Sequence, residues 1–219
     1  MDDGQVQSRG GVTLVGAGHP RPQDIEEALK LAPLLVAADG GADHAIAAGF
    51  TPERVIGDLD SLGETSRRDL AAEKLVFVDD QNSTDFEKAL ERIDAPFVIA
   101  TGFTSGRVDH LLAVCRSLAR RIGPRTLVLG AEDVIFAAPR TLSLDVAPGT
   151  RVSLFPMAAV TGRSEGLEWP IDGLAFHPSG QIGTSNIATG PVRMEFDGPG
   201  MLVIMPREAL AASLAALTG

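Results

Sequence analysis

Residues 34–61 read LLVAADGGADHAIAAGFTPERVIGDLDS, and this stretch contains the unit from which we predict the fold. An apolar, β-rich run over 34–38 ends in Asp-Gly-Gly, a segment of helical period follows over 42–48, and a second apolar run over 54–57 leads into Asp-Leu-Asp. Strand, helix and strand in this order are typical of a parallel β-sheet covered by helices. We therefore predict an α/β domain around this stretch.

The same alternation continues on both sides, from residue 12 to about residue 138. Further apolar runs lie at 12–16, 75–78, 97–100 and 126–129. Further helical periods lie between the runs, near 23–31, 64–72, 84–93 and 108–122. We predict an N-terminal α/β domain over residues 10–138, with a mostly parallel sheet and helices on both of its faces.

Beyond Pro139 the pattern changes to short stretches of alternating hydrophobicity that are separated by Gly and Pro. We expect strands at 141–146, 151–155, 192–196 and 201–205. A helical period returns only at the end of the chain, over 207–217. Together these features predict a smaller C-terminal all-β sandwich domain over residues 139–219.

Charge and composition exclude several classes of protein. A formal net charge of −10 argues against broad binding of duplex DNA, which needs a basic surface. The single cysteine, Cys115, excludes an internal disulfide and a zinc site made of several cysteines. No apolar stretch reaches the roughly 20 residues that span a bilayer, and residues 1–9 are polar, without the apolar run of a signal peptide. We therefore expect a soluble, cytoplasmic protein that begins with a frayed tail over residues 1–9.

Carboxylates follow three successive predicted strands. Asp39 follows the first, Asp58 and Asp60 follow the second, and the third leads into a segment that ends in Asp85. In an extended chain Asp58 and Asp60 point the same way, and like charges about 4 Å apart repel by about 4 kcal/mol at an effective dielectric near 20. Mg²⁺ offsets such repulsion and takes one or two carboxylates together with substrate phosphates. Although a single Asp-Gly-Gly is more often a turn, the recurrence at consecutive strand ends predicts a metal site.

Two further local patterns accompany the acids. Thr84-Asp85-Phe86-Glu87 fits a helix capping box, which explains Thr84 without any role in binding. The run over 97–100 leads into TGFTSGRVDH, residues 101–110, which is a glycine-bearing loop followed by a helix. Backbone N–H groups at such a helix start favour phosphate, and Arg107 can add two parallel hydrogen bonds.

Taken together, these motifs resemble the thiamine pyrophosphokinase family. The matching segments are ADGGA at 38–42, GDLDS at 57–61, DQ with STDF within 80–86, and Gly102 with GRVDH at 106–110. In the second predicted domain, GLEW at 166–169 and GTSN at 183–186 resemble the thiamine-side motifs of that family, many members of which carry a serine at the position of Gly183.

The resemblance implies an ATP:thiamine diphosphotransferase, a homodimer with active sites at the subunit interface, and a defined reaction. The hydroxyethyl oxygen of thiamine attacks the β-phosphorus of ATP, releasing AMP and thiamine diphosphate. Such transfer needs positioning and charge stabilisation, and therefore an acid cluster that holds Mg²⁺ against the triphosphate.

The resemblance and the strand-end pattern together predict the site residues. We expect Asp58, Asp60 and Asp85 to be catalytic and to hold the metal, with Asp85 also a candidate to orient the attacking hydroxyl. We expect the nucleotide to be bordered by Asp39, Gly40, Gln81, Thr84, Gly102, Arg107 and Asp109. For thiamine we expect Trp169, Ser185 and Asn186, because an indole can hold the positively charged thiazolium and the other two supply oriented polar groups.

Two other functions fit the same residues. A diphosphokinase for another small alcohol, such as a hydroxymethylpterin, would share the ATP and metal half and differ in the second domain. A non-catalytic nucleotide sensor would keep the fold, although it would be free to lose some of the acids. A Walker-type NTPase is excluded, because the sequence lacks Gly-x-x-x-x-Gly-Lys-Ser/Thr.

Overall fold

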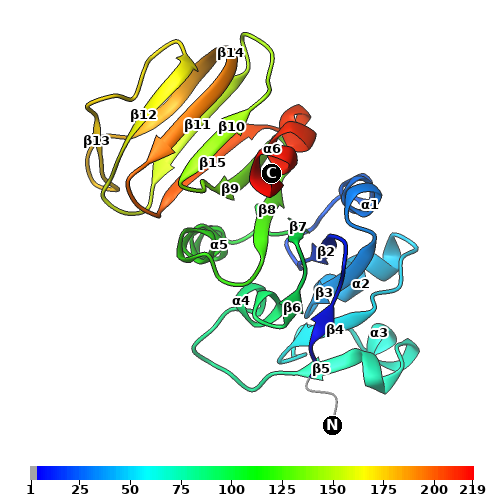
Figure 1. Ribbon diagram of the computed structural model, residues 1–219. Helices are drawn as coiled ribbons and strands as arrows, with labels where there is room; N and C mark the ends of the chain where they lie inside the picture. Colours follow the sequence, from blue (N-terminus) through cyan, green and yellow to red (C-terminus); the bar gives the residue numbers. More distant parts are fainter. Residues whose placement is uncertain (1–3) are drawn as a thin grey trace. The chain divides into compact units, whose positions relative to one another are not determined.

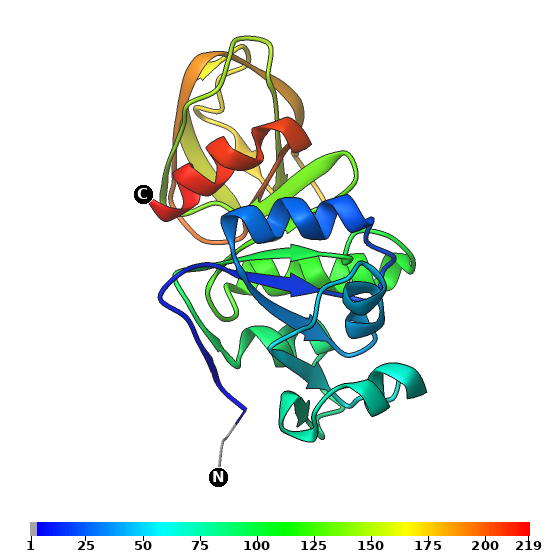
Figure 2. The same ribbon diagram turned by 90° about the vertical axis from the view of Figure 1, so that its right-hand side faces the viewer.

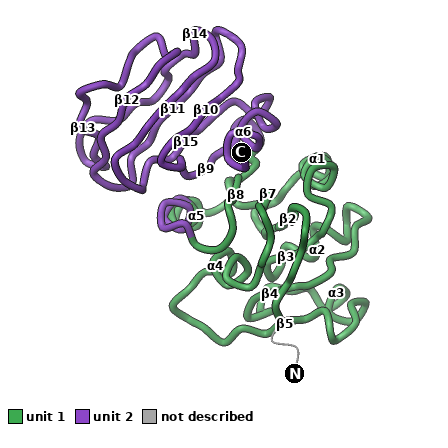
Figure 3. Tube along the Cα trace, in the orientation of Figure 1, with its two compact units in different colours: residues 1–114, 122–130 green, residues 115–121, 131–219 purple. Residues whose placement is uncertain are grey.

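The computed structural model describes residues 4–219 of the chain (Figure 1). These residues form two compact units, coloured separately in Figure 3. The first contains the chain up to residue 114 together with 122–130, and the second contains 115–121 and 131–219. The predicted mixed α/β fold with a large sheet is confirmed, whereas the domain limits 10–138 and 139–219 stay predictions.

The first unit is built on six parallel strands in the order β8-β7-β2-β3-β4-β5. In chain order they are β2 (Val12–Val15), β3 (Leu34–Ala38), β4 (Arg54–Gly57), β5 (Leu75–Phe77), β7 (Phe97–Thr101) and β8 (Arg125–Leu129). All four residues of β2 are buried, as are the last four of β3, β7 and β8. Strands that are covered on both faces carry continuous apolar runs, which is the pattern that the sequence displays.

Helices connect these strands. They are α1 (Pro22–Leu31), α2 (Gly41–Ala47), α3 (Glu64–Asp69), the 3₁₀ turn η1 (Ala72–Lys74), α4 (Asp85–Leu90) and α5 (Val108–Arg120). One buried cluster joins α1 and α2 to the sheet through Ile25, Ala45, Val15 and Leu35, and Figure 2 shows α1 lying along the strands of this unit. Helix α4 contacts β3 and β4, which brings its first residues near the carboxyl ends of both strands.

The prediction of a frayed tail was wrong for residues 6–7. Strand β1 (Val6–Gln7) pairs in parallel with β6 (Ile93–Asp94). Val6 is buried and its N–H donates to the carbonyl of Arg92 at 2.7 Å, so one apolar side chain and main-chain pairing are enough to hold the segment. Residues 1–3, also part of the predicted tail, lie outside the described residues.

The second unit is antiparallel. Its strands are β9 (Asp133–Ala137), β10 (Thr141–Leu144), β11 (Arg151–Pro156), β12 (Val160–Leu167), β13 (Ala175–Phe176), β14 (Gly183–Phe196) and β15 (Met201–Pro206). They run in the order β13-β12-β14-β11-β15-β9, with β10 also paired to β14. The 3₁₀ turn η2 (Arg207–Ala209) and helix α6 (Leu210–Thr218) end the chain, and α6 contacts β10.

Strand β14 changes partners along its length. Its first residues, 183–187, pair with β11, and its last residues pair with β10 and β12. The β12 register shifts between Glu165 and Leu167, where Gly166 has φ +79°. A side chain at Gly166 would overlap the carbonyl oxygen of Pro191, so both the backbone conformation and the space require glycine.

No helix in the described part of the chain is long and apolar enough to cross a membrane.

Candidate active site

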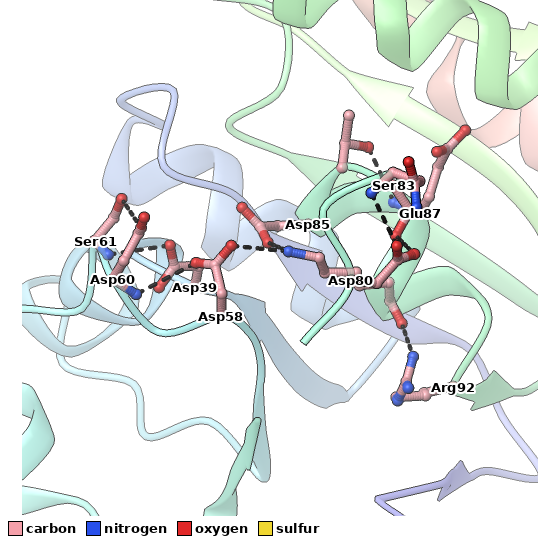
Figure 4. A network of polar contacts seen from close by, with 12 residues as sticks. Asp39, Asp58, Asp60, Ser61, Asp80, Ser83, Asp85, Glu87 and Arg92 are labelled. Atoms are coloured by element: carbon pink, nitrogen blue, oxygen red, sulfur yellow. Dashed lines mark hydrogen bonds and ion pairs between the residues drawn. The ribbon is translucent and has the colours of Figure 1, made fainter. Parts of the chain in front are cut away.

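Three carboxylates meet at the ends of β3 and β4 (Figure 4). Asp39, Asp58 and Asp60 each offer an oxygen, and these oxygens lie within 4.8 Å of one another. Asp39 directly follows β3, with φ +45°, while Asp58 directly follows β4 and Asp60 lies two residues further on. The structure thus brings Asp58 and Asp60 together as predicted, and it adds Asp39, which we had expected beside the nucleotide.

The link between Asp58 and Asp60 differs from the extended backbone that we expected. Leu59 has φ +60° and is buried in an apolar cluster with Val55 and Leu62. The N–H of Asp60 donates to Asp58 Oδ1 at 3.3 Å. Burial of one apolar side chain therefore turns the chain at this point, and the two carboxylates converge through a turn, not through strand alternation.

Asp39 is the most buried of the three acids, with 3% of its surface exposed. Its Oδ2 accepts the N–H of Ser61 at 3.2 Å, whereas its buried Oδ1 has no hydrogen-bond partner among residues 4–219. Burial, followed by the negative charge of Asp85, raises the pKa of Asp39 from 3.8 to about 6. A buried, unpartnered oxygen beside two further carboxylates is the environment that a divalent cation would satisfy.

Lys88, on α4, is a site residue that sequence reasoning missed. Its side chain is 3% exposed, and its Nζ donates to Asp58 Oδ2 at 2.9 Å and to Asp85 Oδ1 at 3.0 Å. The hydrogen bond from Lys88 is the main reason why the pKa of Asp58 is lowered. Asp85 is therefore tied to an ammonium group, and it is not among the three acids whose oxygens converge.

A cavity of about 450 Å³ adjoins these residues, within the first unit. Of the predicted site residues, seven line it: Asp39, Asp58, Gln81, Thr84, Asp85, Gly102 and Arg107. Of the residues predicted for metal and nucleotide, Gly40, Asp60 and Asp109 do not line it, and the three predicted thiamine residues do not line it either. The other fourteen lining residues were not predicted as site residues, and they include Ala17, Gly18, His19, Lys88, Phe103 and His110.

The missed loop over residues 16–19 follows β2, at the same sheet edge. Gly18 N–H donates to the carbonyl of Gly102 at 2.9 Å, so this loop packs directly on the glycine loop that follows β7. A side chain at Gly102, which has φ +79°, would overlap the carbonyl oxygen of Gly16. Short glycine-bearing segments carry little periodicity, and only the sheet order places these two loops side by side.

The loop between β5 and α4 is ordered by its own polar groups. Asp80 accepts hydrogen bonds from Ser83 Oγ and from the N–H of Asn82, and these lower its pKa, the bond from Ser83 most. Thr84 Oγ1 accepts the N–H of Glu87 at 3.3 Å, as the predicted cap requires. The first turn of α4 is thereby fixed with Asp85 facing Lys88.

Arg107 and Asp109 form an exposed ion pair at 2.6 Å at the start of α5. The guanidinium lowers the pKa of Asp109 through this hydrogen bond. Arg107 lines the cavity and Asp109 does not, so Arg107 is the member of the pair that is placed to meet a ligand. An exposed pair of this kind contributes little to stability, so a phosphate could compete for Arg107.

The predicted thiamine residues lie in the second unit and are brought together there. Trp169 is 54% exposed, Ser185 is exposed with φ +64°, and Asn186 is buried. The side-chain amide of Asn186 bonds to the backbone of Trp169. A Cβ at Gly183 would lie 3.2 Å from Leu154 Cβ and from Phe176 Cε1, so a serine there would require these neighbours to shift by a few tenths of an ångström.

Comparison with known proteins gives consistent matches. A family model described as "Thiamin pyrophosphokinase, catalytic domain" matches residues 25–127. Thiamine pyrophosphokinase 1 of Oryza sativa subsp. japonica is 26% identical over 221 residues, covering 77% of this chain and 84% of the relative. The counterpart from Arabidopsis thaliana is 25% identical over 194 residues, covering 71% of each chain.

Solved structures share the fold. Thiamin pyrophosphokinase from Candida albicans superposes with a TM-score of 0.79 at 15% identity and covers 92% of both chains. The yeast enzyme gives a TM-score of 0.72 at 17% identity, covering 95% of this chain and 90% of its own.

Proposed function

Since the chain belongs to the thiamine pyrophosphokinase family, we propose that it transfers the diphosphoryl group of ATP to the hydroxyethyl group of thiamine. The products are thiamine diphosphate and AMP, and the chain is a kinase-type transferase. The family match favours this function over a pterin-type diphosphokinase or a sensor. The observation that carries the proposal is the convergence of Asp39, Asp58 and Asp60 beside the cavity.

We propose that this cluster holds Mg²⁺. The unpartnered, buried Oδ1 of Asp39 and the all-oxygen donor set fit a hard divalent cation. Asp58 and Asp60 keep the role predicted from the sequence, with Asp39 as the third ligand in place of Asp85. When bound, Mg²⁺ would neutralise charge on the phosphate oxygens.

The chain's own residues would bind and orient ATP. Residues of the two glycine loops, 16–19 and 102–106, line the cavity together with Arg107, and backbone N–H groups in such loops favour phosphate. Gln81 and Thr84 border the same space. Lys88 places a second positive charge next to Asp58 and Asp85, where it would stabilise charge on the transferred group.

The reaction itself needs little covalent help from the protein. The thiamine hydroxyl oxygen forms a bond to the β-phosphorus, the bond from that phosphorus to the α,β-bridging oxygen breaks, and AMP leaves with that oxygen. The hydroxyl proton must go to a nearby base. We assign this role to Asp85, because its Oδ1 is held by Lys88 at 3.0 Å while the residue lines the cavity.

Thiamine would contact the second unit through Trp169, whose exposed indole suits a cation. The homodimer with interfacial active sites and the cytoplasmic location stay predictions. Light scattering of the purified chain tests the dimer, and a monomeric mass would contradict it.

The test of the function is AMP release from ATP and Mg²⁺, with and without thiamine, with products identified by mass. We expect thiamine-dependent AMP together with thiamine diphosphate. Asp60→Asn should lower turnover at least 100-fold, because one group that stabilises charge is lost. Asp69 is an exposed acid on α3, and Asp69→Asn should leave turnover unchanged. AMP formed only with another alcohol would overturn the substrate, and no AMP with any acceptor would overturn the enzyme.

A further inference from the structure

Trp169 is the only tryptophan of the chain, and it combines an exposed side chain with a fixed backbone. The residue is 54% exposed. The segment that carries it leaves β12 just after the register shift at Gly166, and the N–H of Glu168 donates to the carbonyl of Ile187 at 2.8 Å. The residue just before Trp169 is therefore still hydrogen-bonded to β14, which fixes the backbone that carries the indole.

Asn186 makes two reciprocal hydrogen bonds to Trp169. Its Nδ2 donates to the Trp169 carbonyl at 2.6 Å, and its Oδ1 accepts the Trp169 N–H at 3.2 Å. The same Oδ1 also accepts the N–H of Ile187 at 2.9 Å. Asn186 is 6% exposed, and its oxygen already accepts two bonds, which is its ordinary capacity. A ligand could use this oxygen only by displacing one of those donors.

The other end of the segment is fixed as well. The N–H of Ile171 donates to Ser164 Oγ at 3.0 Å, and the N–H of Ser164 donates to Asp172 Oδ2 at 3.1 Å. Ile171 is 1% exposed. Between the two fixed ends stands Pro170, which restricts its own backbone and that of Trp169. Residues 169–172 are therefore held at both ends and stiffened in the middle.

We propose that Asn186 is a positioning residue, which fixes Trp169 for contact with the flat cationic ring of the substrate and does not itself touch that substrate. Ser164 is assigned the same role at the other end of the segment. Holding the indole before binding removes the entropy cost of ordering it on binding. This proposal rests on the proposed function, and it replaces the expectation that Asn186 contacts thiamine.

The single tryptophan makes the proposal measurable, because its fluorescence reports on Trp169 alone. In the full-length protein, Asn186→Ala should increase quenching of this emission by acrylamide without any substrate present. It should also raise KM for thiamine about tenfold, the equivalent of about 1.4 kcal/mol. KM for ATP and kcat should stay within about twofold, since the nucleotide residues belong to the other unit.

Two further variants complete the experiment. Ser164→Ala should shift quenching and thiamine KM in the same direction, and it serves as the test if Asn186→Ala does not fold. Gln181→Ala is the matched control and should change neither quantity. Among the described residues, the side-chain amide of this exposed residue hydrogen-bonds only to the carbonyl of Ile182. Circular dichroism and Tm establish that each variant is folded.

Three results would overturn the proposal. Unchanged quenching and unchanged thiamine KM in folded Asn186→Ala would show that the amide does not position Trp169. A large rise in thiamine KM with unchanged quenching would mean that Asn186 contacts the substrate directly. A rise in quenching with unchanged thiamine KM would mean that fixing Trp169 does not serve the substrate. Failure of the proposed function is distinct: the wild-type protein would then release no thiamine-dependent AMP, whatever the quenching result.

Discussion

Replacing Asp39 with Asn should make the metal-free protein more stable at neutral pH, although it should impair the reaction. Asp39 is 3% exposed and its pKa is raised from 3.8 to about 6. Its ionised form is therefore disfavoured in the folded state. At 1.36 kcal/mol per pKa unit, this shift lowers the free energy of unfolding by about 3 kcal/mol once Asp39 is ionised.

The sign of the pH dependence follows from the direction of that shift. Between about pH 4 and pH 6 the folded state keeps the proton that the unfolded state releases, so the contribution of Asp39 to stability is fully present below about pH 4. It is lost as the pH rises through 6. The free energy of unfolding of Asp39→Asn minus that of the wild type, here called the stability gap, should therefore grow by about 3 kcal/mol from pH 4 to pH 8.

Urea unfolding of both proteins in EDTA, at several pH values, measures this gap. Mg²⁺ provides the control, because it should stabilise the wild-type protein at pH 8 and have much less effect on Asp39→Asn. A gap that stays constant from pH 4 to pH 8 would refute the reasoning about burial, and an equal response of both proteins to Mg²⁺ would refute the metal assignment.

Two other substitutions test the site. Lys88→Met leaves Asp58 and Asp85 without their ammonium partner. We expect AMP release to be at least 100-fold slower and the free energy of unfolding in urea to fall by about 2 kcal/mol, which is less than for a fully buried pair because both acids are partly exposed. Normal turnover would contradict the role of Lys88. Gly102→Ala should lower the free energy of unfolding by about 2 kcal/mol or more and raise KM for ATP, since the new side chain would overlap a neighbouring carbonyl. Gly10→Ala should be neutral in the same assays, because, apart from its chain neighbours, no atom of the described residues lies within 4 Å of the added Cβ.

The first unit could be predicted from the sequence because its strands are buried on both faces. Such strands give continuous apolar runs, and the predicted runs over 34–38 and 54–57 coincide with β3 and β4. The second unit was harder. Strand β12, VTGRSEGL, was not predicted at all, because it alternates between exposed and half-buried positions and its small and polar residues give no apolar stripe. Only the last five residues of β14 were predicted, for the same reason.

At the site, the sequence reveals which loops carry acids but not how they converge. The grouping of Asp39 with Asp58 and Asp60 depends on the left-handed turn at Leu59, which no periodicity indicates. Lys88 lies three residues after Asp85 on a predicted helix, so the spacing could have suggested their contact. Its burial could not have been inferred, because it depends on which face of α4 meets β4.

The change of partners along β14 has a consequence for how the second unit opens. This strand of 14 residues pairs with β11 at one end and with β10 and β12 at the other. The two sets of neighbours hold opposite ends of one continuous strand, so separation of either set leaves β14 fixed by the other. Amide protons along both halves of β14 should therefore exchange with solvent at similar, slow rates, through one cooperative opening of the whole unit.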